Sequence, residues 1–237
     1  MVPLRDNNPT QITPFVTYAI IALNVVIFVH QLSLGEGLQD FFNQWAVVPQ
    51  DLTSSFRGQP TDLPHPAWIT LFTSQFLHGG LLHIAGNMLF LWVFGNNIED
   101  KLGHVKFLIF YLGCGALAAL SQWFFHIDSE IPSLGQVVRS SGVMGAYILR
   151  FPRAEILTLI PLGFFWWTVR LPAVFFLGLW FAQQAFNSVA SLNVSIDMGG
   201  VAYWAHAGGF VFGAILGPLL GLFADQTDKS KTERRWP

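Results

Sequence analysis

Three polar side chains lie inside apolar stretches of this chain and are of types used in acid–base chemistry. His83 and Asn87 are four residues apart in one stretch, and His206 lies in the last stretch. Residues four apart on a helix share a face, so we expect His83 and Asn87 to point the same way. An imidazole can take up or release a proton near neutral pH, and a carboxamide can donate hydrogen bonds. Such groups are costly in hydrocarbon, which makes all three candidates for function.

The composition is that of a membrane protein. Hydrophobic residues occupy 52% of the 237 positions and charged residues only 11%, with 23 Phe and 9 Trp. A soluble domain of this size needs more polar side chains to cover its core. Since no polar linker or run of charge divides the chain, we expect one bundle. The single cysteine, Cys114, excludes an internal disulfide.

Six apolar stretches are long enough, or nearly so, to cross a hydrocarbon core that takes about 20 helical residues. They run approximately from Phe15 to Leu34, His83 to Ile98, Val105 to Phe125, Val137 to Leu149, Pro172 to Val189 and Val201 to Phe223. The predicted fold class is therefore all-α, a polytopic bundle of six transmembrane helices. The second and fourth stretches are short, so we expect other helices to enclose them, with a water-accessible cavity above.

The positive residues give the expected orientation, because Lys and Arg are retained on the cytoplasmic side. With the amino terminus inside, ten of the 12 fall on inner segments and only Arg57 and Arg139 fall outside. We therefore expect a multi-pass protein with both termini in the cytoplasm. The predicted organisation is a cytoplasmic segment (1–14), the membrane domain (15–224) and a polar, disordered cytoplasmic tail (225–237).

Two connections are aromatic and weakly polar, which suits a membrane interface better than free solvent. One is the long first loop, Gly35 to Gly80, and the other runs from Ile156 to Val169. We expect the second to lie along the cytoplasmic face or to dip into it.

The last apolar stretch has a small-residue stripe, in which Gly209, Gly213, Gly217 and Gly221 repeat every fourth position. Such a stripe lets another helix approach to backbone contact. His206 lies three residues before the stripe, on its flank. A histidine pressed against a neighbouring helix can orient a partner side chain or take its proton.

Three motifs follow one another along the chain. They are His78-Gly-Gly-Leu-Leu-His83-Ile-Ala-Gly-Asn87 with its continuation to Glu99-Asp-Lys-Leu-Gly103, then Gly142-Val-Met-Gly-Ala-Tyr147, then Ala205-His206-Ala-Gly208-Gly209 with Gly213. In this order and spacing they resemble the bacterial type of rhomboid intramembrane serine protease, over nearly the whole chain. The resemblance implies a six-helix rhomboid-like bundle, which we expect in the bacterial inner membrane. It also implies a structural network role for Glu99.

The resemblance also implies an activity. A serine at the start of the fourth helix would attack the scissile bond, with His206 as general base and then general acid. Asn87 and His83 would stabilise the oxyanion. The substrates would be single-span membrane proteins within the lipid bilayer. No cofactor is implied, because a serine protease uses side chains and water, and no basic patch suggests a nucleic acid.

The chain departs from the family at the nucleophile. Counting back from Gly142, Val137 stands where the serine is expected and Val138 where its following glycine is expected. Arg139 is also out of character inside a span. Ser141 is a weak substitute for the nucleophile, because it lies four residues further along, about one helical turn.

We hypothesise that a shift of reading frame accounts for this departure. The residues Gln-Val-Val-Arg-Ser from Gln136 to Ser140 can be encoded CAA-GTG-GTG-CGA-TCG. With one G before and one C after, the neighbouring frame reads GCA-AGT-GGT-GCG-ATC-GC and encodes Ala-Ser-Gly-Ala-Ile-Ala. This is the family pattern between Gly135 and Gly142, so two compensating single-base insertions or deletions would explain every unusual residue from Gln136 to Ser141.

Other interpretations stay open. Taken singly, His83 with Asn87 could be a polar pair that joins two helices, and His206 a packed core histidine. A metal site is disfavoured, because the inward polar residues include no carboxylate and no third ligand. As alternatives to a protease, the chain could be an inactive rhomboid-like protein that binds transmembrane helices as an adaptor, or a proton-relay transporter. The transporter lacks support, since the sequence has no inverted repeat.

Overall fold

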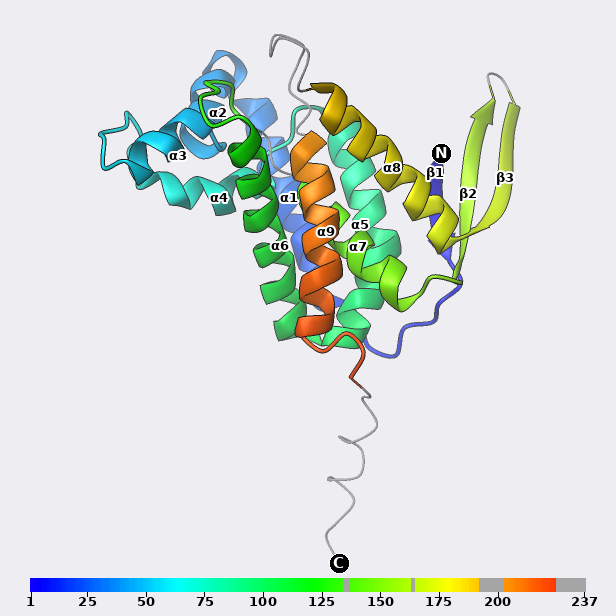
Figure 1. Cartoon of the computed structure of the whole chain (residues 1–237). Helices are drawn as coiled ribbons and strands as arrows, with labels where there is room; N and C mark the ends of the chain where they lie inside the picture. Colours follow the sequence, from blue (N-terminus) through cyan, green and yellow to red (C-terminus); the bar gives the residue numbers. More distant parts are fainter. Residues whose placement is uncertain (134–136, 163–164, 192–202, 225–237) are drawn as a thin grey trace, which may run out of the picture.

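The computed structural model describes residues 1–133, 137–162, 165–191 and 203–224, with the backbone alone for residues 137–139 and 162. The α-helices and strands in chain order are β1 (Val2–Asp6), α1 (Phe15–Ser33), α2 (Leu38–Trp45), α3 (Pro49–Phe56), α4 (Thr70–Thr73), α5 (Leu81–Leu102), α6 (His104–Phe125), α7 (Val137–Arg150), β2 (Glu155–Leu162), β3 (Phe165–Pro172), α8 (Ala173–Ser191) and α9 (Tyr203–Leu219). Short 3₁₀ turns at Gly35–Gly37, Ala67–Ile69 and Ser74–Phe76 join the small helices. Figure 1 shows α2, α3 and α4 on one flank of the bundle and the strands on the opposite flank, beside α8.

Each of the six apolar stretches overlaps one helix, and these helices are α1, α5, α6, α7, α8 and α9. Four of these helices, α1, α5, α6 and α8, are long and apolar enough to cross a membrane. The prediction that the second span is short was wrong, because α5 has 22 residues. Its last turn is polar, and it stays helical because buried side chains such as Glu99 and Asp100 bind other parts of the chain.

The joint between α5 and α6 depends on one glycine. Gly103 separates the two helices and has a φ of 75°, in the left-handed region that favours glycine. Its N–H bonds to the carbonyl of Glu99 and its carbonyl accepts the N–H of Phe107. One residue therefore ends one helix and begins the next.

The helix α7 is short, as predicted, with 14 residues, and it is enclosed. Its residues from Ser140 to Tyr147 are all buried. Phe94 of α5 packs its ring against Tyr147 with centroids 4.8 Å apart, and Phe94 also contacts Phe176 of α8 at 6.4 Å. Because its middle faces protein on all sides, α7 does not need the length of a lipid-exposed helix.

The first loop is folded rather than extended. Its helices build a small apolar cluster around Val47, Leu52, Ala67 and Leu71, which packs on Ala119 of α6. Thr53 fixes this cluster to α6, since its hydroxyl accepts the indole N–H of Trp123 at 2.9 Å and donates to the carbonyl of Ile127 at 2.7 Å. Several of its aromatic side chains, among them Trp68 and Phe72, remain exposed.

A three-stranded antiparallel sheet, in the order β1-β2-β3, corrects the expectation of an all-α chain. The segment expected to lie flat on the membrane face is the hairpin β2–β3, and β1 pairs with β2 from Val2↔Leu159 to Asp6↔Ile156. The hairpin is rich in β-branched and aromatic residues, which favour strands over helices. Ile156 and Thr158 are fully buried, whereas Phe165, Trp166 and Trp167 are exposed.

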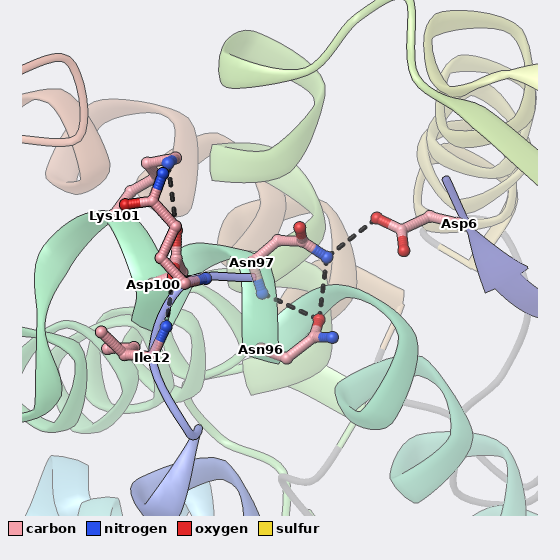
Figure 2. A network of polar contacts seen from close by, with 7 residues as sticks. Asp6, Ile12, Asn96, Asn97, Asp100 and Lys101 are labelled. Atoms are coloured by element: carbon pink, nitrogen blue, oxygen red, sulfur yellow. Dashed lines mark hydrogen bonds and ion pairs between the residues drawn. The ribbon is translucent and has the colours of Figure 1, made fainter. Parts of the chain in front are cut away.

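Polar contacts hold the residues before α1 against the end of α5 (Figure 2). The amide of Asn97 donates to the carboxylate of Asp6 at 2.8 Å, and Asp100 accepts the backbone N–H groups of Gln11 and Ile12 at 2.6 and 3.0 Å. Lys101 pairs with Asp100 at 3.0 Å. The amino-terminal segment is thereby fixed to the bundle, and the tail 225–237 lies outside the described residues.

Glu99 fixes the start of α1 in a similar way. Its fully buried carboxylate accepts the N–H groups of Val16 and Thr17 at 2.9 and 2.8 Å and the hydroxyl of Thr17 at 2.6 Å. His104 also contacts it at 2.6 Å through Nδ1. The first N–H groups of a helix have no partner within the helix, and a carboxylate there satisfies them and matches the helix dipole.

Candidate active site

The helix α5 carries two of the three predicted residues. Asn87 is 4% exposed, and its Nδ2 is buried without a hydrogen-bond partner among the described residues. His83, one turn earlier, is half-buried as a residue. Its Nε2 atom is buried, and it too has no hydrogen-bond partner among the described residues. The four-residue spacing places both on one face of the helix. Two hydrogen-bonding groups on that face therefore have unused capacity.

The residues before α5 are held in place by Gln31 of α1. Its carboxamide donates to the carbonyl of His78 at 2.7 Å and accepts the N–H of His78 at 3.0 Å. The ring of His78 then meets that of His83 edge-on, with centroids 5.8 Å apart. Gln31 was not predicted from the sequence, although a buried Gln in an apolar stretch is the same kind of signal as His83.

His206 lies in the first turns of α9 and is 7% exposed. Its Nδ1 is 2.7 Å from Oε1 of Gln184 on α8. Trp180, one turn before Gln184, stacks on the imidazole with centroids 6.2 Å apart and an interplanar angle of 25°, and Tyr203 meets it edge-on at 6.3 Å. The imidazole is therefore fixed by a hydrogen bond and by two aromatic rings.

The three helices α5, α8 and α9 meet at this site. Phe90 of α5 contacts Trp180 at 6.4 Å between ring centroids, so Trp180 packs against both α5 and α9. The structure thus brings His83, Asn87 and His206 to neighbouring parts of the bundle.

The helix α7 contributes the nucleophile in the predicted scheme. Gln136 lies outside the described residues, as do the side chains of Val137, Val138 and Arg139. Ser140 is 3% exposed, and its hydroxyl donates to the backbone carbonyl of Asn87 at 3.3 Å. Ser141 is fully buried. A direct contact therefore joins α7 to the helix turn that carries Asn87.

Glycines bring α7 and α9 into backbone contact, as the stripe predicted. A Cβ added at Gly213 would overlap the carbonyl of Gly142, and one added at Gly145 would overlap the carbonyl of Phe210. Gly221 is not part of the stripe, because it lies beyond α9 with a φ of 99°. The close approach keeps the helix of His206 against the helix that follows the predicted nucleophile position.

The arrangement suits proton transfer beside an anion that forms during a reaction. A fixed imidazole can exchange a proton, and unpartnered buried donors can bind a developing negative charge. Among the residues described, no group of three His, Cys, Asp or Glu side chains is placed to hold a metal ion. Gln184 was not predicted, although polar residues are rare in its apolar stretch.

The family model and the relatives described below point to the same family. A model of the Rhomboid domain matches residues 65–223. The chain is 26% identical over 223 residues to "Rhomboid protein 1, mitochondrial" of Saccharomyces cerevisiae, covering 92% of this chain and 56% of the relative. It is 28% identical over 213 residues to "Rhomboid protease GluP" of Bacillus subtilis, covering 89% of this chain and 36% of the relative.

A further match is "Presenilin-associated rhomboid-like protein A, mitochondrial" of Danio rerio, 29% identical over 154 residues, which covers 61% of this chain and 36% of the relative. The matched part of this chain thus spans between 36% and 56% of the length of these relatives.

Proposed function

This chain belongs to the rhomboid family, and from that premise we propose that its bundle is built as a serine-type intramembrane endopeptidase. The proposed reaction is hydrolysis of a peptide bond in the transmembrane helix of a single-span membrane protein. In this scheme His206 is the general base and then the general acid, and Asn87 and His83 stabilise the oxyanion. The similarity to a relative named as a protease supports the proposal at the level of the family.

The observation that carries the proposal is the unused hydrogen-bonding capacity of Asn87 and His83. A buried donor without a partner costs about 1–3 kcal/mol. Asn87 Nδ2 and His83 Nε2 are both buried without a partner in the described ranges, one helical turn apart. A carbonyl oxygen that becomes negatively charged in the transition state would satisfy both.

His206 has the surroundings that a general base requires. Its ring is buried, and contacts on two sides hold its orientation. A serine alcohol is a poor nucleophile until a base removes its proton, and the same imidazole can then protonate the leaving amine.

The position of the nucleophile is occupied by Val137 in this sequence. We propose that the active form of the protein carries serine there, within Ala-Ser-Gly-Ala-Ile-Ala in place of Gln136 to Ser141. Sequencing the gene across these codons checks the origin of the difference. The proposal of a frame shift fails if the codons cannot be converted into this pattern by two compensating single-base insertions or deletions.

A second candidate function applies to the chain with Val137. A rhomboid-like bundle without its serine would bind transmembrane helices without cleaving them, as an adaptor or in quality control. The burial of Ser140 and Ser141 favours this alternative, because neither hydroxyl is exposed to an incoming substrate. Ser141 remains the weaker choice of nucleophile for the same reason.

The proposed topology has six spans, with both termini in the cytoplasm of a bacterium and the bundle in the inner membrane. The spans would be α1, α5, α6, α7, α8 and α9. The helices α7 and α9 have 14 and 17 residues and fall short of a lipid-exposed span. Their mutual packing is compatible with that length, since enclosed helices need not match the bilayer.

The test compares the chain as given with a variant that carries Gln136→Ala, Val137→Ser, Val138→Gly, Arg139→Ala, Ser140→Ile and Ser141→Ala. Both are reconstituted with a single-span reporter protein and with a fluorophosphonate probe that labels activated serines. We expect labelling and cleavage in the variant and neither in the chain as given. In the same background, Asn87→Ala should lower the cleavage rate by about two to three orders of magnitude.

Two controls separate the candidates. His206→Ala in the serine variant should abolish labelling while the reporter helix still binds. If the serine variant binds the reporter but neither cleaves nor reacts, helix binding without catalysis is the better description. Labelling of the chain as given, lost in Ser141→Ala, would instead establish Ser141 as the nucleophile.

A further inference from the structure

We propose that Gln184 is a positioning residue for His206, fixing the tautomer in which Nε2 is free to accept a proton. This inference rests on the proposed function, because it assigns a supporting residue to the base of the same site. It adds a third member to a pair that the sequence motifs give as serine and histidine alone.

The first step of the argument concerns the proton on the ring. A carboxamide oxygen can only accept a hydrogen bond, so the 2.7 Å contact with Gln184 Oε1 is a hydrogen bond in the tautomer that has its proton on His206 Nδ1. A neutral imidazole carries one proton, which leaves Nε2 with a lone pair. A neutral base therefore has Nε2 as its only accepting nitrogen.

The second step concerns the orientation of the ring. A single hydrogen bond at Nδ1 leaves the imidazole free to rotate about the bond axis, but Trp180 and Tyr203 limit that rotation. Trp180 and Gln184 are one helical turn apart on α8, so one face of this helix supplies both contacts. Two of the three contacts that orient the Nε2 lone pair therefore come from α8, although His206 belongs to α9.

The third step compares Gln184 with its neighbour on the chain. Gln183 has the same side chain and is exposed, whereas Gln184 is half-buried and bonded to His206. The position, and not the residue type, distinguishes the two. Gln183→Leu is therefore a matched control for Gln184→Leu.

The role resembles that of the third group in a serine protease triad, but without charge. An aspartate in that place holds the tautomer and also stabilises the imidazolium. A neutral glutamine supplies the tautomer alone. It thereby avoids a buried carboxylate inside a membrane, where an ionised group is costly.

The test reads the tautomer directly. ¹⁵N NMR of histidine-labelled protein separates protonated from unprotonated ring nitrogens, and the His206 signals are identified by their loss in His206→Ala. In the chain as given and in Gln183→Leu, we expect Nδ1 to be protonated and Nε2 unprotonated. In Gln184→Leu we expect the protonated share of Nδ1 to fall. Gln184→Glu, whose side chain can still accept, should retain the Nδ1 proton.

The same variants are then assayed in the background with serine restored at position 137. We expect Gln184→Leu to lower kcat by about 10- to 100-fold, by analogy with the loss of a partner that orients a metal-bound histidine, with KM little changed. Gln183→Leu should leave both values as they are.

The inference is overturned if His206 carries its proton on Nε2 in the chain as given, or if Gln184→Leu leaves the tautomer unchanged. If His206 has its proton on Nδ1 but the serine-restored chain never cleaves, the role of Gln184 is supported and the proposed protease function fails. If Gln184→Leu leaves kcat unchanged in a chain that cleaves, the role of Gln184 fails and the protease function stands.

Discussion

The α-carbon of Gly213 on α9 faces the backbone carbonyl of Gly142 on α7 so closely that a Cβ at Gly213 would overlap it. Gly145 has the same relationship to the carbonyl of Phe210, one turn away along the two helices. Two helices in backbone contact gain dispersion energy along their length, which is one of the attractions available between helices in lipid.

We predict that Gly145→Ala and Gly213→Ala each destabilise the bundle by about 1–3 kcal/mol, because the added methyl group forces the helices apart. The measurement is the unfolding midpoint in detergent. The matched control is Gly178→Ala on α8, where an added Cβ meets nothing within 4 Å. There, alanine should stabilise by up to about 1 kcal/mol through its higher helix propensity. Equal effects of all three substitutions would contradict the close approach.

The second prediction concerns pH and Asp6. Burial raises the pKa of the Asp6 carboxyl, while the hydrogen bonds from Tyr147 and Asn8 lower it in part. A carboxyl with a raised pKa is harder to ionise in the folded state, so its contribution to stability is complete below its ordinary value of 3.8. That contribution then falls as the pH rises through the folded pKa.

Asp6→Asn should remove this loss, since the amide oxygen can still accept from Tyr147 and Asn97 and carries no charge. As the pH rises from about 3.8, we expect Asp6→Asn to become more stable relative to the unsubstituted protein. Thermal unfolding across the acidic range measures it. Asp40→Asn, in an exposed position on α2, controls for the loss of one negative charge. A difference that is independent of pH would contradict the assignment.

Glu99 gives the third prediction. Its buried carboxylate accepts from two N–H groups and one hydroxyl of α1 and contacts His104. Glu99→Gln replaces one accepting oxygen with an NH₂ group that faces these donors. We expect a loss of about 1.5–3 kcal/mol in the free energy of unfolding, the usual range for hydrogen bonds to a charged group. Glu36→Gln, exposed between α1 and α2, should have little effect. A similar result for the two substitutions would mean that Glu99 does not hold α1.

The fourth prediction concerns the exposed aromatic residues of the hairpin. Phe165, Trp166 and Trp167 are 79%, 70% and 66% exposed, and Trp is favoured at the boundary between lipid and water. We expect this part of β3 to contact lipid. A spin label at Thr168→Cys, in a Cys114→Ala background, should be more accessible to oxygen than to a water-soluble nickel chelate.

Gln59→Cys, at an exposed polar position of the first loop, is the control for that label and should favour the nickel chelate. If the label at position 168 also favours the nickel chelate, the hairpin lies in water.

The sequence was most informative for features that depend on a single helix, such as its boundaries or the residues that share a face. The boundaries of α1, α6 and α7 follow from apolar stretches, and the common face of His83 and Asn87 follows from a spacing of four. The glycine stripe likewise predicted a backbone contact, because small residues at one face act the same way whichever helix they meet.

Contacts between distant parts of the chain were not predictable in this way. The pairing of β1 with β2 and the bond between Asp6 and Tyr147 join segments far apart in sequence, and neither segment has a pattern that names its partner. Gln184 could have been noticed as a polar residue in an apolar stretch, but its role depends on which helix packs against α8. The end of α5 extended past its apolar stretch because tertiary contacts satisfy its polar side chains.

The pairing of Val2 with Leu159 has a consequence for assembly during synthesis. Strand β1 leaves the ribosome about 150 residues before its partner β2, and at about 5–20 residues per second it waits on the order of ten seconds or more without that partner. The helices α1, α5 and α6 can form and enter the membrane in that interval. The sheet can therefore close only late, after the chain as far as the hairpin has been made and placed.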